Sequence, residues 1–103
     1  MSTPSATYSL EQIIVRLRHA LPRLSAEYSV QSLGIFGSYA RNEQGVASDL
    51  DILVTFSEIP GLIKYIELEQ HLTDMLGIPV DLVMESALRP QIHTQVVQEV
   101  QRL

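Results

Sequence analysis

The chain has 103 residues, the length of one small domain, and 46% of them are hydrophobic, which is enough for one core. A formal net charge of −5 with only seven Lys and Arg excludes a broad nucleic-acid-binding surface, which requires clustered basic residues. The absence of cysteine excludes disulfides, zinc–thiolate sites and thiol nucleophiles.

Targeting and membrane segments are not evident in the sequence. No apolar run reaches the ~18–20 residues of a membrane span, and residues 1–7 lack the basic-then-apolar order of a signal peptide. We therefore expect a cytoplasmic protein with a flexible tail over residues 1–8 and a single domain over residues 9–103.

A helix comes first. Ser9 and Gln12 have the spacing of a capping box, and apolar residues then recur at helical intervals. The helix should end near Pro22, because proline cannot continue the backbone hydrogen-bond ladder comfortably. Residues 30–36 and 49–56 then predict two strands, and residues 38–43 predict a short helix between them.

The second half of the chain predicts a helix, a strand and a helix. Pro60 suits the first turn of a helix that Gly77 and Pro79 close, and residues 80–84 predict the third strand. Pro90 begins the last helix. Its expected core-facing residues are Ile92, Val96, Val100 and Leu103. This alternation predicts an α/β fold, a small sheet with about four helices packed on it.

Two aspartates stand at the start of the second predicted strand. Residues i and i+2 of a strand point to the same face, so the carboxylates of Asp49 and Asp51 can share a cation. Acids in such an apolar run would be costly without one. Asp81 adds a third carboxylate from the third strand. Mg²⁺ prefers a few hard oxygen ligands together with waters or phosphates, so the three aspartates are candidate metal ligands.

The dipeptide Gly37-Ser38 ends the first predicted strand. A strand that ends in Gly-Ser and opens a helix offers free N–H groups, a small hydroxyl and the positive helix end to an anion. Each feature alone has an ordinary explanation, because Gly-Ser is a common turn and Asp81 could lie on the polar face of a half-exposed strand. Their combination on three strands indicates a site for the phosphates of a nucleotide beside a metal.

Three segments in this order and spacing resemble the minimal nucleotidyltransferase (MNT) family of the polymerase-β-like superfamily: Phe36-Gly37-Ser38-Tyr39-Ala40-Arg41, Ser48-Asp49-Leu50-Asp51-Ile52-Leu53-Val54 and Val80-Asp81-Leu82-Val83. The resemblance covers residues 10–103. It implies the mixed sheet of that fold, ATP as the nucleotide, one or two Mg²⁺ ions, and an Arg41 that reaches the phosphates. Many relatives carry Gly after this arginine, where the chain has Asn42.

The same resemblance implies the antitoxin of a HEPN/MNT toxin–antitoxin pair, which transfers AMP to a tyrosine of the HEPN ribonuclease. Asp49 and Asp51 would hold the metal, and Asp81 would complete the metal site and deprotonate or orient the acceptor hydroxyl. Two alternatives stay open. One is a catalytically silent antitoxin that neutralises its toxin by binding, and the other is a small-molecule, aminoglycoside-type nucleotidyltransferase whose pocket is completed by dimerisation.

Other polar residues receive simpler interpretations. Three histidines on separate predicted helices lack a second ligand at metal spacing and are expected to be surface or partly packed residues: His19, His71 and His93. Acidic residues of the third helix are expected on its solvated face: Glu67, Glu69 and Asp74. Tyr39 could pack in the core or contact the rim of the cleft.

Overall fold

The computed structural model describes residues 8–41, 43 and 49–103. Most of the predicted flexible tail, and Asn42, lie outside these residues. The elements follow one another as α1 (Leu10–Tyr28), β1 (Val30–Phe36), β2 (Leu50–Phe56), α2 (Leu62–Leu76), β3 (Val80–Met84), a 3₁₀ turn η1 (Glu85–Ala87), α3 (Pro90–Glu99) and β4 (Gln101–Arg102). No helix in the described part of the chain is both long and apolar enough to cross a membrane.

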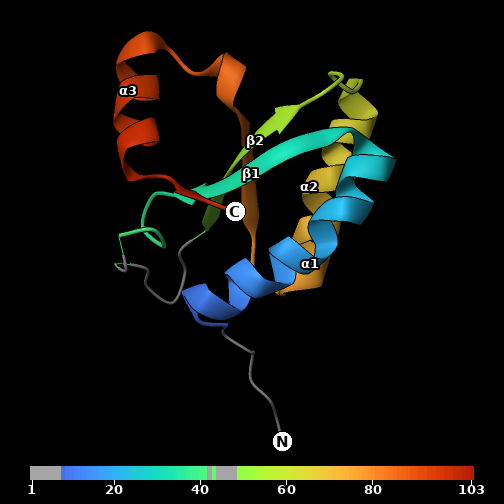
Figure 1. Cartoon of the computed structure of the whole chain (residues 1–103), viewed down its shortest axis with the longest axis horizontal. Helices are drawn as coiled ribbons and strands as arrows, with labels where there is room; N and C mark the ends of the chain where they lie inside the picture. Colours follow the sequence, from blue (N-terminus) through green and yellow to red (C-terminus); the bar gives the residue numbers. More distant parts are fainter. Residues whose placement is uncertain (1–7, 42, 44–48) are drawn as a thin grey trace, which may run out of the picture.

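The strands form one mixed sheet in the order β3–β2–β1–β4. β1 pairs antiparallel with β2 and β4, whereas β2 and β3 run parallel. A parallel pair requires a crossover connection, and α2 provides it. Figure 1 shows α1 and α2 beside each other against the sheet, with α3 apart from them and the C-terminus beside the strands. The predicted small mixed α/β sheet is confirmed.

The core lies between the sheet and the two long helices. In α2, Leu68, Leu72 and Leu76 recur every fourth residue and are fully buried, which places one apolar stripe against the strands. In β2, successive residues are buried on both faces, as expected for a central strand. The buried residues of α1 are Ile13, Leu17 and Leu24.

The first helix begins as predicted but continues past Pro22. Ser9 Oγ accepts a hydrogen bond from the Gln12 N–H (3.2 Å), and Gln12 Oε1 accepts one from the Ser9 N–H (2.9 Å), which completes the capping box. The expected end at Pro22 is wrong, because α1 continues through Tyr28. Leu24 is 1% exposed, and full burial of a leucine is worth ~1.5–3 kcal/mol, comparable with the ~3 kcal/mol cost of an internal proline.

The end of the chain also differs from the prediction. α3 starts at Pro90 as expected but stops at Glu99, and Gln101–Arg102 form an edge strand beside Gly34 and Ile35. Of the expected core residues, Val96 is buried and Ile92 is 48% exposed.

A close approach between backbones explains the early end of α3. Val100 is extended (φ −67°, ψ 137°), and a Cβ on Gly34 would lie only 2.6 Å from Val100 Cγ2. The Leu103 N–H then donates to the Leu33 carbonyl at 3.1 Å. The C-terminal residues therefore lie along β1 instead of extending the helix.

The backbone of the edge strand β3 is bonded by side chains of α2. Glu69 Oε2 accepts from the Leu82 N–H at 2.9 Å, and the Tyr65 hydroxyl donates to the Leu82 carbonyl. Thr73 Oγ1 accepts from the Val80 N–H at 3.1 Å. Glu69 is therefore more than the solvated residue that the sequence predicts, because its carboxylate has a structural contact.

Candidate active site

The three aspartates predicted as a site lie at one end of the sheet, where two of them face each other across paired strands. Asp51 is the second residue of β2, and the parallel register places it opposite Asp81 of β3. Side chains of paired residues share a face of the sheet, on strands ~4.8 Å apart. Asp49 precedes β2 by one residue and is exposed, as is Asp81, whereas Asp51 is half-buried. The register of β2 with β3 therefore brings together Asp51 and Asp81, which are far apart in the sequence.

The environment of Asp51 opposes its ionisation. Partial burial is the largest cause that raises the pKa of this carboxyl above its usual range, followed by the negative charges of Asp81 and Asp49. Arg41 acts in the opposite direction, and Glu99 adds a smaller increase. A cation bound between these carboxylates would offset both the cost of burying a charged Asp51 and the repulsion among the acids. Hard oxygen donors at such a position suit Mg²⁺.

The ligand set is not closed. Within residues 8–41, 43 and 49–103, no group of three or more His, Asp or Glu side chains stands ready to hold a metal ion. Asp51 and Asp81 share a face of the sheet, and the charges of Asp81 and Asp49 act on Asp51, but the three carboxylates do not surround a common point. This openness fits a magnesium site that is completed by waters and substrate phosphates rather than by protein alone.

Gly37 brings the end of β1 against Asp51. Its φ of 76° lies in the left-handed region, which side chains rarely adopt, and a Cβ at this position would clash with Oδ2 of Asp51. Position 37 therefore requires glycine for two reasons: the backbone is left-handed, and the Asp51 carboxylate leaves no room for a side chain. The result is that the predicted phosphate-binding dipeptide and the predicted metal ligand are in contact.

The segment after Gly37 is a turn and not the predicted short helix. The Arg41 N–H donates to the Gly37 carbonyl at 3.1 Å, and the Glu43 N–H donates to the Ser38 carbonyl at 2.8 Å. Residues 37–41 contain the dipeptide that the sequence predicts to bind phosphate, and we refer to them for that reason as the phosphate turn. Tyr39 is 3% exposed inside it, so the packing interpretation of this residue is correct. Burial is also the main cause that raises the pKa of Tyr39, with Asp49 second.

Glu99 joins the site although no motif in the sequence singles it out. Its Oε1 accepts from the Gly37 N–H at 3.0 Å and from Arg41 Nη1 at 2.9 Å. Arg41 Nε also donates to Glu43 Oε1 at 3.0 Å. Glu99 is 62 positions from Gly37 along the chain, and no local pattern indicates that they meet.

Residues 16–103 match the nucleotidyltransferase domain family. The chain belongs to this family. The enzyme class predicted from the motifs is thus confirmed, and the protein is a nucleotidyltransferase. The individual roles of Gly37, Ser38, Arg41 and the three aspartates stay predictions.

Known proteins resemble this nucleotidyltransferase over nearly its whole length. Protein adenylyltransferase MntA of Thermococcus cleftensis is 46% identical over 95 residues, which cover 92% of this chain and 96% of that protein. A solved structure assigned to the minimal nucleotidyltransferases has a TM-score of 0.80 and 36% identity, and the match covers 96% of this chain and 100% of the other. A solved complex from Shewanella oneidensis contains a tri-AMPylated HEPN toxin and an MNT antitoxin. The match to it has a TM-score of 0.58 and 29% identity, and it covers 91% of this chain and 67% of the other.

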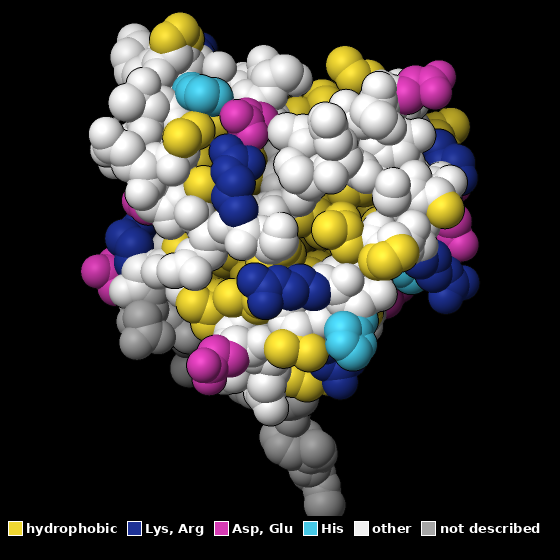
Figure 2. Space-filling view, viewed as in Figure 1, with side chains coloured by type: hydrophobic (Ala, Val, Ile, Leu, Met, Phe, Trp, Pro, Cys, Tyr) yellow, Lys and Arg dark blue, Asp and Glu magenta, His cyan; other side chains and the backbone are white. Residues whose placement is uncertain are grey.

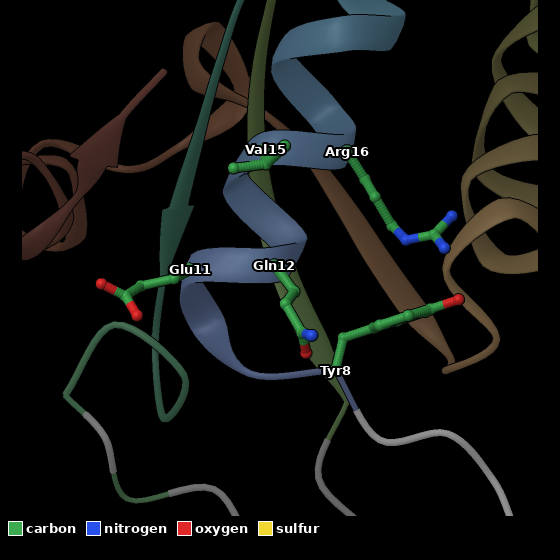
Figure 3. A pocket seen from close by; sticks show the side chains of 5 residues that line it. All are labelled: Tyr8, Glu11, Gln12, Val15 and Arg16. Atoms are coloured by element: carbon green, nitrogen blue, oxygen red, sulfur yellow. The ribbon is translucent and has the colours of Figure 1, made fainter.

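Other surface features of the nucleotidyltransferase lie away from these residues. An open hollow at the start of α1 is lined by Tyr8, Glu11, Gln12, Val15 and Arg16. There the Arg16 guanidinium lies 4.2 Å from the centre of the Tyr8 ring (Figure 3). None of these is a predicted site residue. Acidic and basic side chains are interspersed across the face drawn in Figure 2, in line with the low basic content.

Two of the histidines have ordinary contacts. His71 packs against the Tyr28 ring, with 6.1 Å between the ring centres, and His93 Nε2 lies 3.2 Å from Glu85 Oε2. Both fit the interpretation of partly packed residues.

Proposed function

We propose that this nucleotidyltransferase is an antitoxin that transfers AMP from ATP to a tyrosine of a HEPN ribonuclease toxin, in the cytoplasm. The register of Asp51 with Asp81, beside the phosphate turn, is the observation that carries the chemistry. The acceptor is inferred from similarity to an MNT antitoxin seen with an AMPylated HEPN toxin. The net charge of −5 suits a partner whose RNA-binding surface is basic.

The metal would be held by Asp49 and Asp51, with Asp81 completing the set. One or two Mg²⁺ ions, when bound, supply neutralisation of phosphate charge and alignment of the triphosphate for in-line attack. Ser38 contributes its hydroxyl as a hydrogen-bond donor to the outer phosphates. Arg41 contributes the N–H groups that Glu43 and Glu99 leave unengaged.

Transfer requires one bond to form and one to break. The acceptor hydroxyl oxygen bonds to the α-phosphorus, and the bond from the α-phosphorus to the bridging oxygen of the β-phosphate breaks, releasing pyrophosphate. Asp81 is exposed at the same face as Asp51, so it can take the hydroxyl proton. Since Asp49 is exposed as well, a side chain on another protein can reach the site.

The test is a mass measurement on the toxin. Incubation of the protein with Mg²⁺, ATP and a cognate HEPN toxin should add one or more units of ~329 Da to the toxin, on tyrosine, and abolish its RNase activity. The added phosphates would repel RNA as well as block access. The matched control is Asp49→Asn/Asp51→Asn.

The control separates the two alternatives from the proposal. A toxin neutralised without a mass change, equally well by the double variant, would establish a silent antitoxin that acts by binding. Transfer of AMP to an aminoglycoside, with none to the toxin, would establish the small-molecule enzyme instead.

A further inference from the structure

Glu99 is the last residue of α3, and its side chain is 26% exposed. One of its carboxylate oxygens, Oε1, accepts hydrogen bonds from the Gly37 N–H (3.0 Å) and from Arg41 Nη1 (2.9 Å). These two donors belong to the first and last residues of the phosphate turn. A single oxygen therefore ties both ends of the turn together.

The two bonds fulfil different needs. Gly37 is buried, so its N–H requires a partner in the folded protein, and Glu99 supplies it. Arg41 is a long, half-exposed side chain whose guanidinium would otherwise sample many directions. A charge-assisted bond restricts it to one region. The Gly37 N–H is consequently occupied within the protein, which leaves Ser38 and the remaining Arg41 donors for phosphate.

The position of Glu99 is itself fixed to the strand that carries the turn. Beyond it, Val100 packs on Gly34, Gln101–Arg102 pair with β1, and the Leu103 N–H bonds to Leu33. The segment that follows Glu99 thus anchors its carboxylate to β1. The phosphate turn follows directly after Phe36, the last residue of the same strand.

We propose that Glu99 is a positioning residue of this nucleotidyltransferase, which holds the phosphate turn and Arg41 in the arrangement that receives the triphosphate of ATP. The role rests on the proposed nucleotidyl transfer and deepens it. Glu99 acts through Gly37 and Arg41, without contact to the reacting atoms. The negative charge of Glu99 is balanced by the guanidinium of Arg41. The three aspartates instead repel one another, so they require a bound cation.

The experiment compares three substitutions of Glu99 in the full chain. Glu99→Ala removes both hydrogen bonds and should weaken Mg·ATP binding, and raise the KM for ATP, about tenfold or more. Glu99→Gln keeps an acceptor oxygen in place without the charge and should stay within about threefold of wild type. Glu99→Asp keeps the charge but is shorter by one methylene, so it should behave like Glu99→Ala.

Leu24→Val is the matched stability control. Leu24 is buried in α1, so a smaller side chain weakens the core, while Glu99, its C-terminal anchor and the phosphate turn keep their residues. We expect it to lower the melting temperature without raising the KM for ATP. An equal rise in KM for Leu24→Val and Glu99→Ala would show that only general stability is involved.

Several results would overturn the role of Glu99. Unchanged ATP affinity in Glu99→Ala would show that the turn needs no support. Tighter ATP binding in both Glu99→Ala and Glu99→Gln would mean that the carboxylate occupies the phosphate position and competes with substrate. Better function of Glu99→Asp than of Glu99→Gln would assign the effect to charge instead of position.

Binding and transfer are measured separately so that the two proposals fail separately. Calorimetry with Mg·ATP needs no acceptor protein. Wild-type protein that binds ATP but transfers nothing to the toxin would contradict the proposed function while the Glu99 comparison still decides the positioning role. Wild-type protein that binds no ATP would contradict both.

Discussion

Substitution of Gly37 by alanine should damage stability and activity together. The left-handed backbone at Gly37 costs a non-glycine residue ~1–2 kcal/mol. The new methyl group would also meet the Asp51 carboxylate, and overpacking of this kind costs ~1–3 kcal/mol. The total expected loss is therefore ~2–5 kcal/mol. Because Asp51 must move away, transfer should fall by about a hundredfold, the penalty that a 1 Å misplacement can produce.

Gly77 provides a matched control for the backbone contribution. Its φ is 72°, but a Cβ added there would meet nothing within 4 Å, so Gly77→Ala should cost only the ~1–2 kcal/mol of backbone strain. Urea unfolding should place the midpoint of Gly37→Ala below that of Gly77→Ala by roughly 1 M, given m values of ~1–3 kcal/mol per M.

A double-mutant cycle isolates the contact with Asp51. In an Asp51→Ala background the clashing oxygen is absent, and the nearest remaining atom, Cβ, lies 3.3 Å from the added methyl group. The cost of Gly37→Ala should then drop by ~1–3 kcal/mol. Equal midpoints for Gly37→Ala and Gly77→Ala, with no coupling to residue 51, would refute the close packing of turn and carboxylate.

Three further predictions concern the aspartates. Asp49→Asn/Asp51→Asn should abolish nucleotidyl transfer without lowering the melting temperature of the metal-free protein, because like charges are removed from one site; transfer at the wild-type rate would show that the metal assignment is wrong. Asp81→Asn should retain Mg·ATP binding by calorimetry but lose most transfer, and a fully active variant would remove Asp81 from the site. Because the pKa of Asp51 is raised, the folded state binds the proton of this carboxyl more readily than the unfolded state does. Ionisation of Asp51 therefore destabilises the metal-free protein as the pH rises above the ordinary pKa of 3.8. Asp51→Asn should therefore be more stable than wild type near pH 7 by urea unfolding, with the advantage shrinking as pH falls toward 4, and an advantage independent of pH would contradict the burial of this carboxylate.

Much of the fold follows from local sequence pattern. The bounds of β1 and β3 agree with the prediction, and β2 begins one residue later than expected, because apolar runs bounded by turn residues are local signals. The capping box at Ser9 and the glycine that ends α2 are local as well. The same kind of pattern predicts Asp51 and Asp81 on two strands of one sheet, which the register of β2 and β3 supports, whereas Asp49 lies one residue before β2.

The errors share a dependence on tertiary contacts. α1 passes Pro22 because Leu24 is buried in the core, which no local rule contains. The last helix ends early because the absence of a side chain at Gly34 lets Val100 and β4 approach β1. That same approach delivers Glu99 to the phosphate turn. Glu99 is 62 positions from Gly37, so no local pattern around Gly37 could predict their hydrogen bond.

The bonds that α2 makes to Leu82 have a consequence for how molecules meet. An edge strand normally exposes unpaired N–H and C=O groups, which invite strands of other chains and lead to aggregation. On β3, Glu69 and Tyr65 already engage both backbone groups of Leu82, and Thr73 engages the Val80 N–H. A foreign strand would have to displace a carboxylate and two hydroxyls to extend the sheet there. These three bonds therefore oppose growth of the sheet from molecule to molecule on the side that carries Asp81.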